Sequence, residues 1–118
     1  IYLIVFFNLT IQMYSIRKRV IPVLSLYNYD LVKTKKFKKP KYIGDPINAV
    51  KIFNEKEVDE LAFIDITPLS IRPEPDFNYI KKITTECFIP LSYGGKIRTI
   101  DHIRKILSIG VEKVILNT

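Results

Sequence analysis

The fold is decided by a short apolar run, Leu61-Ala62-Phe63-Ile64-Asp65-Ile66, which carries a carboxylate near its end. Unbroken apolar runs of this length are typical of strands in a parallel sheet, because such strands are covered on both faces. Three further segments fit this description, at residues 20–24, 88–91 and 111–116. The sequence therefore predicts four buried strands.

Amphipathic patterns between these strands predict three helices. Asp45 is placed to cap the first helix, Pro46 suits its first position, and the helix is expected to end near Lys56. The predicted caps of the next two helices are Asp76 and Thr99, and Gly110 is placed to end the last one. The apolar stripes comprise Ile47, Ala49, Val50, Ile52 and Phe53, then Phe77, Ile80 and Ile83, then Ile100, Ile103, Ile106 and Leu107.

The resulting order, β-α-β-α-β-α-β, implies a parallel sheet with right-handed crossovers. A doubly wound sheet and half of a barrel share this order. No G-x-G-x-x-G motif follows the first strand, so a dinucleotide site of the common type is not predicted. Residues 27–44, between the first strand and the first helix, are predicted to be a long basic loop.

Length and charge narrow the choice of function. The chain has 118 residues, whereas a complete (β/α)₈ barrel needs about 250. The net charge of +7 favours anionic partners such as a phosphorylated metabolite. Residues 33–41 contain six lysines, which fit a solvated loop. Nucleic-acid binding would call for arginines and aromatics on one face, so no nucleic-acid partner is predicted.

The sequence offers little for metal or redox chemistry. Cys87, the one cysteine, lies in an apolar run and is expected to be a buried structural thiol. His102 is expected at the surface rather than in catalysis. No metal site and no cofactor are predicted, because a metal site would call for more ligands.

The first residues stand apart from the rest. Residues 1–7 are almost entirely apolar, but a membrane span takes about 20 residues. Basic residues follow this run instead of preceding it, which is the wrong order for an export signal. Met13 precedes the first predicted strand. We therefore expect residues 1–14 to be a non-native leader and residues 15–118 to form the domain, with a cytoplasmic location and no membrane partner.

The carboxyl ends of the predicted strands carry polar residues and glycines. In parallel α/β folds such ends gather on one rim, where substrates bind. A carboxylate such as Asp65 can serve as a general acid or base, or it can cap the following loop. Paired glycines let backbone N–H groups approach a phosphate, or they make a tight turn. The rim residues are Ser25, Asp65, Tyr93-Gly94-Gly95 and Asn117-Thr118.

Several motifs, in order and without a gap, resemble the cyclase subunit of imidazole glycerol phosphate synthase. The resemblance covers about residues 15–118 and matches the N-terminal half of that (β/α)₈ barrel. The motifs are Arg19-Val-Ile-Pro-Val-Leu, Leu31-Val-Lys33, Gly44-Asp45-Pro46, Asp59-Glu60-Leu61-x-Phe63-x-Asp65-Ile66-Thr67, Tyr93-Gly94-Gly95 and Lys113-Val-x-x-Asn117-Thr118.

The resemblance implies an enzyme of histidine biosynthesis. It would take ammonia from a glutaminase subunit, and it would cleave and cyclise a doubly phosphorylated ribonucleotide. By resemblance Asp65 lies beside the active site and Lys33, in a mobile lid, contacts substrate. The expected phosphate-binding residues are Gly94, Gly95, Lys96, Asn117 and Thr118, and the expected ammonia gate is Arg19, Glu60 and Lys113.

Two departures from the family pattern bear on activity. Ser25 stands where the family has its first catalytic aspartate, and a serine needs an activating partner to act as a base. Lys96 stands where the third glycine of a triple-glycine turn is usual, and its side chain either reaches a phosphate or blocks it. The second catalytic aspartate belongs to the other half of the barrel.

Three functions therefore remain open. The first is a cyclase of histidine biosynthesis, and the second is a related barrel that channels ammonia to a bacterial surface sugar. The third is a non-catalytic half-barrel, in which open sheet edges favour a homodimer.

Overall fold

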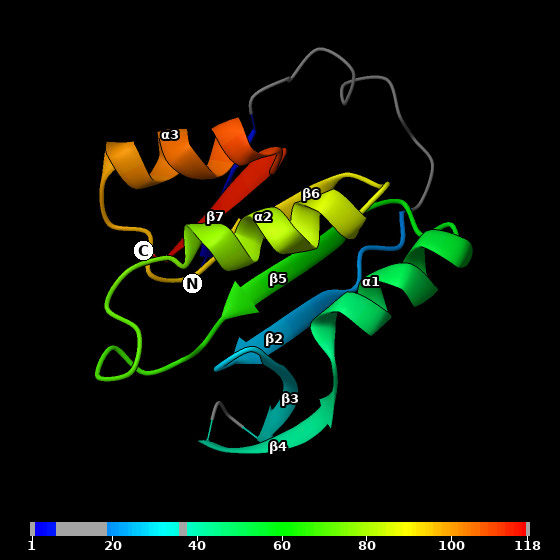
Figure 1. Ribbon diagram of the computed structural model, residues 1–118, viewed down its shortest axis with the longest axis horizontal. Coiled ribbons are helices and arrows are strands. Elements are labelled where there is room, and N and C mark those ends of the chain that lie inside the picture. Colours follow the sequence, from blue (N-terminus) through cyan, green and yellow to red (C-terminus); the bar gives the residue numbers. More distant parts are fainter. Residues whose placement is uncertain (1, 7–18, 36–37, 118) are drawn as a thin grey trace.

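The computed structural model describes residues 2–6, 19–35 and 38–117, and for residues 2–6, 34–35 and 38–40 it describes the backbone alone. Within this part of the chain the strands form one sheet in the order β1-β7-β6-β5-β2-β3-β4 (Figure 1). The elements are β1 (Tyr2–Phe6), β2 (Val23–Tyr27), β3 (Asp30–Lys35), β4 (Lys38–Gly44), α1 (Pro46–Glu55), β5 (Leu61–Asp65), α2 (Phe77–Glu86), β6 (Leu91–Gly94), α3 (Ile100–Ile109) and β7 (Lys113–Asn117).

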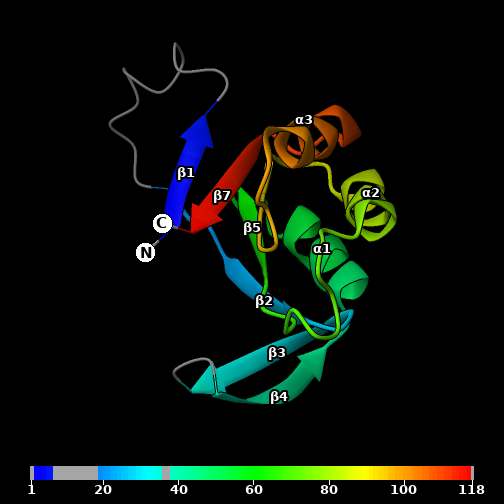
Figure 2. The same cartoon turned by 90° about the vertical axis from the view of Figure 1, so that its left-hand side faces the viewer.

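The four central strands confirm the predicted alternation. Strands β2, β5, β6 and β7 are parallel to one another, and α1, α2 and α3 connect them in that order. The three helices lie on the same face of the sheet (Figure 2). This arrangement is the one expected for half of a (β/α)₈ barrel, in which helices cover the outside of a curved parallel sheet.

The predicted helix caps are also confirmed. The Asp45 side chain accepts a hydrogen bond from the backbone N–H of Asn48 at 3.0 Å, which satisfies one of the free donors at the start of α1. Asp76 and Thr99 cap α2 and α3 in the same way. Gly110 ends α3 with a φ of +124°, a conformation that residues with a side chain rarely adopt.

The hydrophobic core lies between the helices and the sheet face that they cover. Alternate residues of each strand point into it, so one face of every parallel strand is fixed against the helices. Its most deeply buried members are Leu26, Val50, Leu61, Phe63, Ile80, Ile83, Tyr93, Ile106 and Val114. Two residues of the predicted stripes are not part of it, because Ile52 is 54% exposed and Ile100 is 66% exposed. Both lie at the border of their helix's apolar face.

The prediction of a loop over residues 27–44 is wrong. Strands β3 and β4 form an antiparallel hairpin there, and β3 also pairs with the end of β2. Asn28 and Tyr29 make the two-residue turn between β2 and β3, and both have positive φ angles of 46° and 72°. Such turns usually contain glycine. This one does not, so the local sequence does not indicate a hairpin. Leu31 and Val32 are buried, which anchors the hairpin to the rest of the sheet.

Strand boundaries also differ from the prediction. The first predicted strand, residues 20–24, is displaced to Val23–Tyr27, and the third, residues 88–91, is displaced to Leu91–Gly94. Apolar residues that precede these strands are exposed, as Phe88 shows with 83% of its surface accessible. Ser25 lies inside β2 and Ser92 lies inside β6. Their side chains project from the face of the sheet that the helices do not cover, where a polar residue is tolerated.

Strand β1 pairs antiparallel with β7 along its whole length, from Tyr2 opposite Asn117 to Phe6 opposite Lys113. It belongs to the segment predicted as a non-native leader, and residues 1 and 7–14 of that segment lie outside the described part. The assignment of residues 1–14 as a leader stays a prediction. None of the helices in the described ranges is long and apolar enough to cross a membrane.

Two neighbouring positions in α1 test the observed packing. Val50 is fully buried, so Val50→Ala is expected to lower the free energy of unfolding by about 1.5–3 kcal/mol. Ile52→Ala is the matched control on the same helix, and it is expected to cost less than about 1 kcal/mol because half of the side chain is already in water. Urea unfolding followed by circular dichroism measures both, and equal losses would contradict the packing.

Candidate functional site

The carboxyl ends of the parallel strands lie along one edge of the sheet. Strand β5 ends at Asp65, β6 at Gly94 and β7 at Asn117. The arrowheads of β2 and β5 point the same way in Figure 1. This edge is called the rim below, and it is where parallel α/β folds place their functional residues.

Asp65 is a buried carboxylate at the centre of the rim. One carboxylate oxygen accepts a hydrogen bond from the backbone N–H of Thr67 at 2.9 Å. The other oxygen forms an ion pair with the guanidinium of Arg72, also at 2.9 Å. Asp65 and Arg72 are 3% and 7% exposed, so the two charges neutralise each other inside the protein. Burying either charge alone would be costly.

Arg72 was not singled out from the sequence. It lies in the loop between β5 and α2, where no periodic pattern indicates which side chains turn inward. Its guanidinium carbon lies 4.3 Å from the centre of the Tyr29 ring, which is a favourable cation–π contact. Burial alone would lower the pKa of Arg72, but the hydrogen bond and the charge of Asp65 raise it above its ordinary value. Arg72 therefore stays protonated beside the Asp65 carboxylate.

A second set of contacts ties the β2–β3 turn to the start of α2. The Tyr29 hydroxyl donates to the carboxylate of Asp76 at 2.5 Å, and the Tyr79 hydroxyl donates to the backbone oxygen of Tyr29 at 3.3 Å. The two tyrosine rings meet edge to face, with centroids 4.8 Å apart. The backbone N–H of Asn28 donates to the Thr67 hydroxyl at 2.9 Å. The hairpin is thus fixed relative to the rim.

These contacts change the ionisation of two groups. Burial alone would raise the pKa of Asp76, but hydrogen bonds from the Tyr29 hydroxyl and the Tyr79 backbone hold it below its usual value. For Tyr79, burial and, to a smaller extent, the nearby carboxylates Asp45 and Asp30 raise the pKa of the phenol to about 12. Tyr79 therefore stays a hydrogen-bond donor at neutral pH.

The glycines after β6 pack tightly against their neighbours. A Cβ on Gly94 would lie 2.8 Å from the Ile115 side chain. A Cβ on Gly95 would lie 2.4 Å from the backbone oxygen of Asp65, and Gly95 also has a positive φ of 107°. Both positions therefore call for glycine. Lys96 follows with a φ of 65°, and its amine donates to the same Asp65 oxygen at 3.2 Å.

The rim brings only some of the predicted residues together. Gly95 and Lys96 contact Asp65, whereas Asn117 is exposed at the end of β7, with β6 between it and β5. Ser25 lies opposite Ile64 of β5, so strand alternation turns it to the face away from the Asp65 carboxylate. Lys33 is exposed on β3, opposite Lys41 of β4. Thr118 lies outside the described residues.

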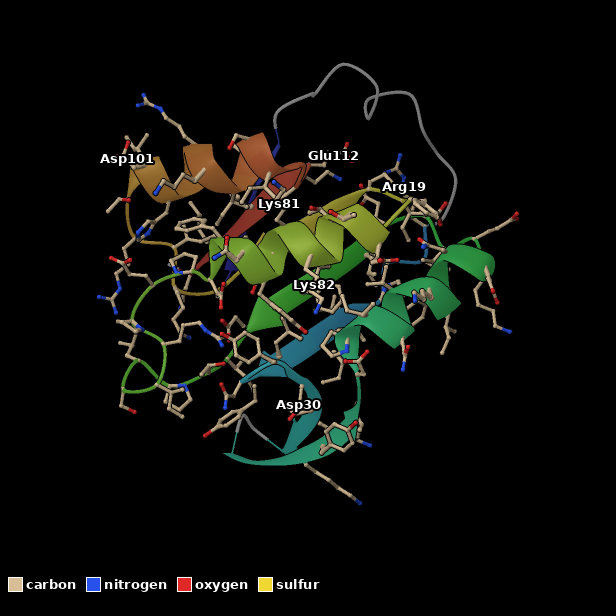
Figure 3. The ribbon with its side chains drawn as sticks, in the orientation of Figure 1. Arg19, Asp30, Lys81, Lys82, Asp101 and Glu112 are labelled. Atoms are coloured by element: carbon tan, nitrogen blue, oxygen red, sulfur yellow. The ribbon has the colours of Figure 1, made fainter. Side chains whose placement is uncertain are left out.

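The three residues of the predicted ammonia gate meet at the opposite edge. Glu60 directly precedes β5, and its carboxylate contacts the amine of Lys113 at the start of β7. The guanidinium of Arg19 lies 3.8 Å from the same Glu60 oxygen. Glu60 and Lys113 are 6% and 4% exposed. Figure 3 shows Arg19 at the end of the sheet away from the rim.

Backbone contacts hold Arg19 beside Glu60. The N–H of Val20 donates to the Asp59 carboxylate at 2.7 Å, and the N–H of Asp59 donates to the oxygen of Val20 at 3.1 Å. The residues next to Arg19 and Glu60 in the chain are thus bound to each other. Each end of β5 therefore carries its own cluster of charges, with Glu60 at one end and Asp65 at the other.

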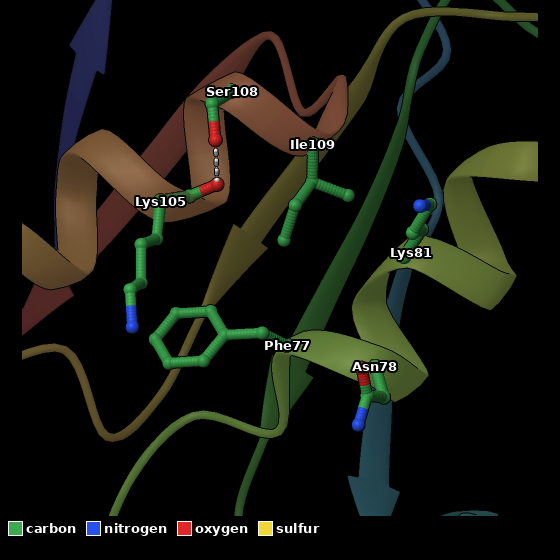
Figure 4. Close-up of a pocket in the computed structure, with 6 residues that line it drawn as sticks. All are labelled: Phe77, Asn78, Lys81, Lys105, Ser108 and Ile109. Atoms are coloured by element: carbon green, nitrogen blue, oxygen red, sulfur yellow. Dashed lines mark hydrogen bonds between the residues drawn. The ribbon is translucent and has the colours of Figure 1, made fainter.

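A pocket of about 250 Å³ lies elsewhere, between α2 and α3 (Figure 4). Its lining includes the Phe77 ring, which lies 4.9 Å from the amine of Lys105. None of the predicted site residues lines it. Cys87 is half-buried rather than fully buried, and its thiol donates to the backbone oxygen of Ile89. His102 is partly buried, and its ring accepts from the backbone N–H of Arg98.

Comparison with known proteins identifies the family. A model of the family described as histidine biosynthesis protein matches residues 19–118. The chain belongs to this family. Its members are (β/α)₈ barrels, and the described part of the chain fits half of one.

Individual relatives agree with this assignment. The chain is 56% identical over 103 residues to a Pseudomonas aeruginosa protein named "Putative imidazole glycerol phosphate synthase subunit hisF2". It is 40% identical over 101 residues to the imidazole glycerol phosphate synthase subunit HisF of Methanococcus maripaludis. These matches cover 87% and 86% of this chain but 41% and 37% of the relatives. The chain thus spans about two fifths of the length of its curated relatives.

The buried pair at the rim provides a test of the site's architecture. Arg72→Met is expected to lower the free energy of unfolding by about 3 kcal/mol, because it leaves the Asp65 charge buried and unpaired. Arg104→Met is the control, since Arg104 pairs with Asp101 at the surface and its loss is expected to cost about 0.5 kcal/mol or less. Urea titration measures both, and equal effects would contradict a buried pair.

Asp76 makes the stability depend on pH. Because folding lowers its pKa, Asp76 stabilises the folded state above the unfolded-state pKa and loses this effect as the pH falls through the lowered value. Asp76→Asn retains a good N-cap residue but not the charge. The difference in unfolding free energy between wild type and Asp76→Asn is expected to be largest near pH 7 and to shrink below about pH 4.

Glu74→Gln is the control for this pH series, because Glu74 is exposed in the same loop. The difference between wild type and Glu74→Gln is expected to change less between pH 7 and pH 3 than the difference for Asp76→Asn. A constant difference for Asp76→Asn as well would show that the Tyr29 and Tyr79 hydrogen bonds do not favour the ionised carboxylate.

Proposed function

We propose that this chain is the N-terminal half of an ammonia-using cyclase of histidine biosynthesis. It would act in the cytoplasm on a doubly phosphorylated ribonucleotide, together with the remaining half of the barrel and a glutaminase subunit. The observation that carries the proposal is the placement of two charged clusters at opposite ends of one strand. Arg19, Glu60 and Lys113 meet where β5 begins, whereas Asp65, Arg72 and Lys96 meet where it ends.

The first cluster has the chemistry of a gate for neutral ammonia. Two cations face the Glu60 carboxylate at the amino-terminal edge of the parallel strands. Ammonium would be repelled by Lys113 and Arg19, whereas neutral ammonia would not. Arg19 and Glu60 precede β2 and β5, and Lys113 begins β7, on the side away from the rim. Ammonia that enters there would travel along the uncovered face of the sheet.

The second cluster suits an anionic substrate. The Asp65 charge is already neutralised by Arg72, and Lys96 adds a further cation beside it. Gly94 and Gly95 keep the backbone after β6 free of side chains, so a phosphate can approach its N–H groups. Asn117 and Thr118 remain proposed phosphate ligands from β7, and Lys33 remains a proposed substrate contact from the β3–β4 hairpin.

A second candidate function is amidation of a bacterial surface sugar by the same kind of barrel. The departure at Ser25 favours it. Ser25 lies on the uncovered face of β2, where ammonia is proposed to arrive. A hydroxyl without an activating partner is a poor base at neutral pH, so Ser25 does not replace the catalytic aspartate of the cyclase. In this candidate the ammonia gate and the glutaminase partner are retained, and the cyclisation chemistry is not.

A reconstituted barrel tests the two candidates together. The chain is co-expressed with the part of the Pseudomonas aeruginosa relative that follows the matched 103 residues. Formation of the imidazole product is then measured with ammonium chloride and with glutamine plus a glutaminase subunit. A histidine-pathway cyclase is expected to form product from both nitrogen sources. Ser25→Asp is expected to raise the rate about 100-fold or more, because a positioned carboxylate supplies the general base.

Ser108→Asp is the control, since it adds the same charge on the exposed face of α3. It is expected to leave the rate at the wild-type level. If Ser25→Asp forms no imidazole product from either nitrogen source in a folded complex, the cyclase proposal is wrong. The sugar candidate predicts that result, and it also predicts transfer of glutamine nitrogen to an acidic or amino sugar by the wild type.

A further inference from the structure

Tyr29 adopts a backbone conformation that is unfavourable for a bulky side chain. Its φ of 72° lies in the left-handed region, where a Cβ crowds the neighbouring backbone. Asn28, the other residue of the β2–β3 turn, is of a type that tolerates this region, whereas tyrosine is not. A glycine at position 29 would make the same turn without steric conflict. The turn thus retains a strained tyrosine, and strain of this kind is concentrated at functional sites.

Burial does not explain why tyrosine stands at this position, because 43% of its surface is exposed. Its contacts are directional instead. The hydroxyl donates to the Asp76 carboxylate, the guanidinium of Arg72 lies 4.3 Å from the ring centre, and the Tyr79 ring meets it edge to face. All three partners belong to the β5–α2 loop or to the first turn of α2. The Tyr29 side chain therefore binds the turn to one segment of the rim.

The same turn reaches both oxygens of the Asp65 carboxylate through one intermediate residue each. One oxygen accepts from the backbone N–H of Thr67, and the Thr67 hydroxyl accepts from the backbone N–H of Asn28. The other oxygen pairs with Arg72, whose guanidinium stacks on the Tyr29 ring. Arg72 also donates to the Thr67 hydroxyl at 3.4 Å, which joins the two paths. The orientation of the Asp65 carboxylate is therefore coupled to the turn.

The turn also carries the hairpin on which Lys33 lies. Within the described residues, β3 pairs with β2 only from Asp30 to Val32, whereas Lys33 pairs with Lys41 of β4. The β3–β4 hairpin extends away from the parallel strands (Figure 2). The position of Lys33 relative to the rim thus depends on three residue pairs and on the contacts that the turn makes.

We propose that Tyr29 is a positioning residue that holds the β3–β4 hairpin and the Asp65 carboxylate in one joint arrangement through Arg72. The inference rests on the proposed function, in which Lys33 and Asp65 belong to the substrate site. Displacement of the hairpin would remove the ring from Arg72 and would release one support of the Asp65 carboxylate. With the ring in place, both sides of the site are ordered before substrate binds, so binding does not have to order them.

Amide hydrogen exchange in the full chain tests the coupling. The reporter is the N–H of Thr67, which bonds to the Asp65 carboxylate and not to Tyr29. Tyr29→Gly suits the turn and is expected to leave the chain folded, but to make exchange at Thr67 about 10-fold faster or more. Tyr29→Phe retains the ring over Arg72 and is expected to keep most of the protection. The NMR order parameters of the Lys33 and Lys41 amides are expected to fall in Tyr29→Gly.

Two controls separate this role from a general effect on stability. Tyr42→Ala removes the same type of side chain from β4 of the same hairpin, where 63% of it is exposed, and is expected to change exchange at Thr67 less than about 2-fold. The amide of Phe63, which is fully buried on the central strand β5, reports global unfolding and is expected to respond less than Thr67 to Tyr29→Gly.

Four results would overturn the proposal. The first is unchanged exchange at Thr67 in Tyr29→Gly, and the second is an equal acceleration at Thr67 and Phe63. The third is a Tyr29→Phe variant that behaves like Tyr29→Gly, since the hydroxyl and not the stacking on Arg72 would then matter. The fourth is a set of order parameters for Lys33 and Lys41 that stays at the wild-type values.

Kinetics of the reconstituted barrel separate this outcome from that of the proposed function. Tyr29→Gly added to Ser25→Asp is expected to raise KM about 10-fold and to change kcat less than about 3-fold, since only the ordered fraction of sites binds substrate. A loss of kcat at constant KM would contradict positioning. Imidazole product with unchanged exchange at Thr67 would reject the role of Tyr29 alone. Faster exchange without imidazole product from Ser25→Asp would reject the cyclase reaction alone.

Discussion

The ion pair between Asp65 and Arg72 is the interaction on which the rim depends. Asp65 ends the central strand β5, and its carboxylate is too deeply buried to remain charged without a partner. Arg72 supplies that partner from the following loop and stacks on Tyr29, so the loop and the β2–β3 turn are held in one arrangement. The backbone oxygen of Asp65 then contacts Gly95 and Lys96, in the turn that follows β6. Asp65 thereby connects four segments of the chain through its carboxylate and its backbone oxygen.

The sequence was sufficient for the parts of the fold that depend on local patterns. Apolar runs, three capped helices and Gly110 each follow from rules about neighbouring residues, and the structure has them. The resemblance grouped Arg19, Glu60 and Lys113, which lie far apart in the chain, and the structure brings them together.

What the sequence did not reveal depends on long-range contacts. The hairpin was hidden because its turn, Asn28-Tyr29, lacks the glycine that usually marks such turns. The burial of Arg72 has no local signal, since a charged residue in a polar loop is usually exposed. Ser25 and Asp65 both end strands in the sequence, yet their side chains lie on different faces, because the register between β2 and β5 is fixed only by folding. The site roles of these residues remain predictions.

The two outer members of the parallel sheet differ in how they could be extended. Within the described residues, β3 pairs only with the last three residues of β2, Ser25 to Tyr27, so in this part of the chain no strand covers the first part of β2 on that side. Strand β7 is covered by β1 from end to end. A complete barrel of this type has eight parallel strands. Its fifth strand would pair with β7 and would therefore have to displace β1, whereas its eighth strand could pair with β2 directly. Closure of a barrel would thus require an exchange of strands at β7 and not at β2.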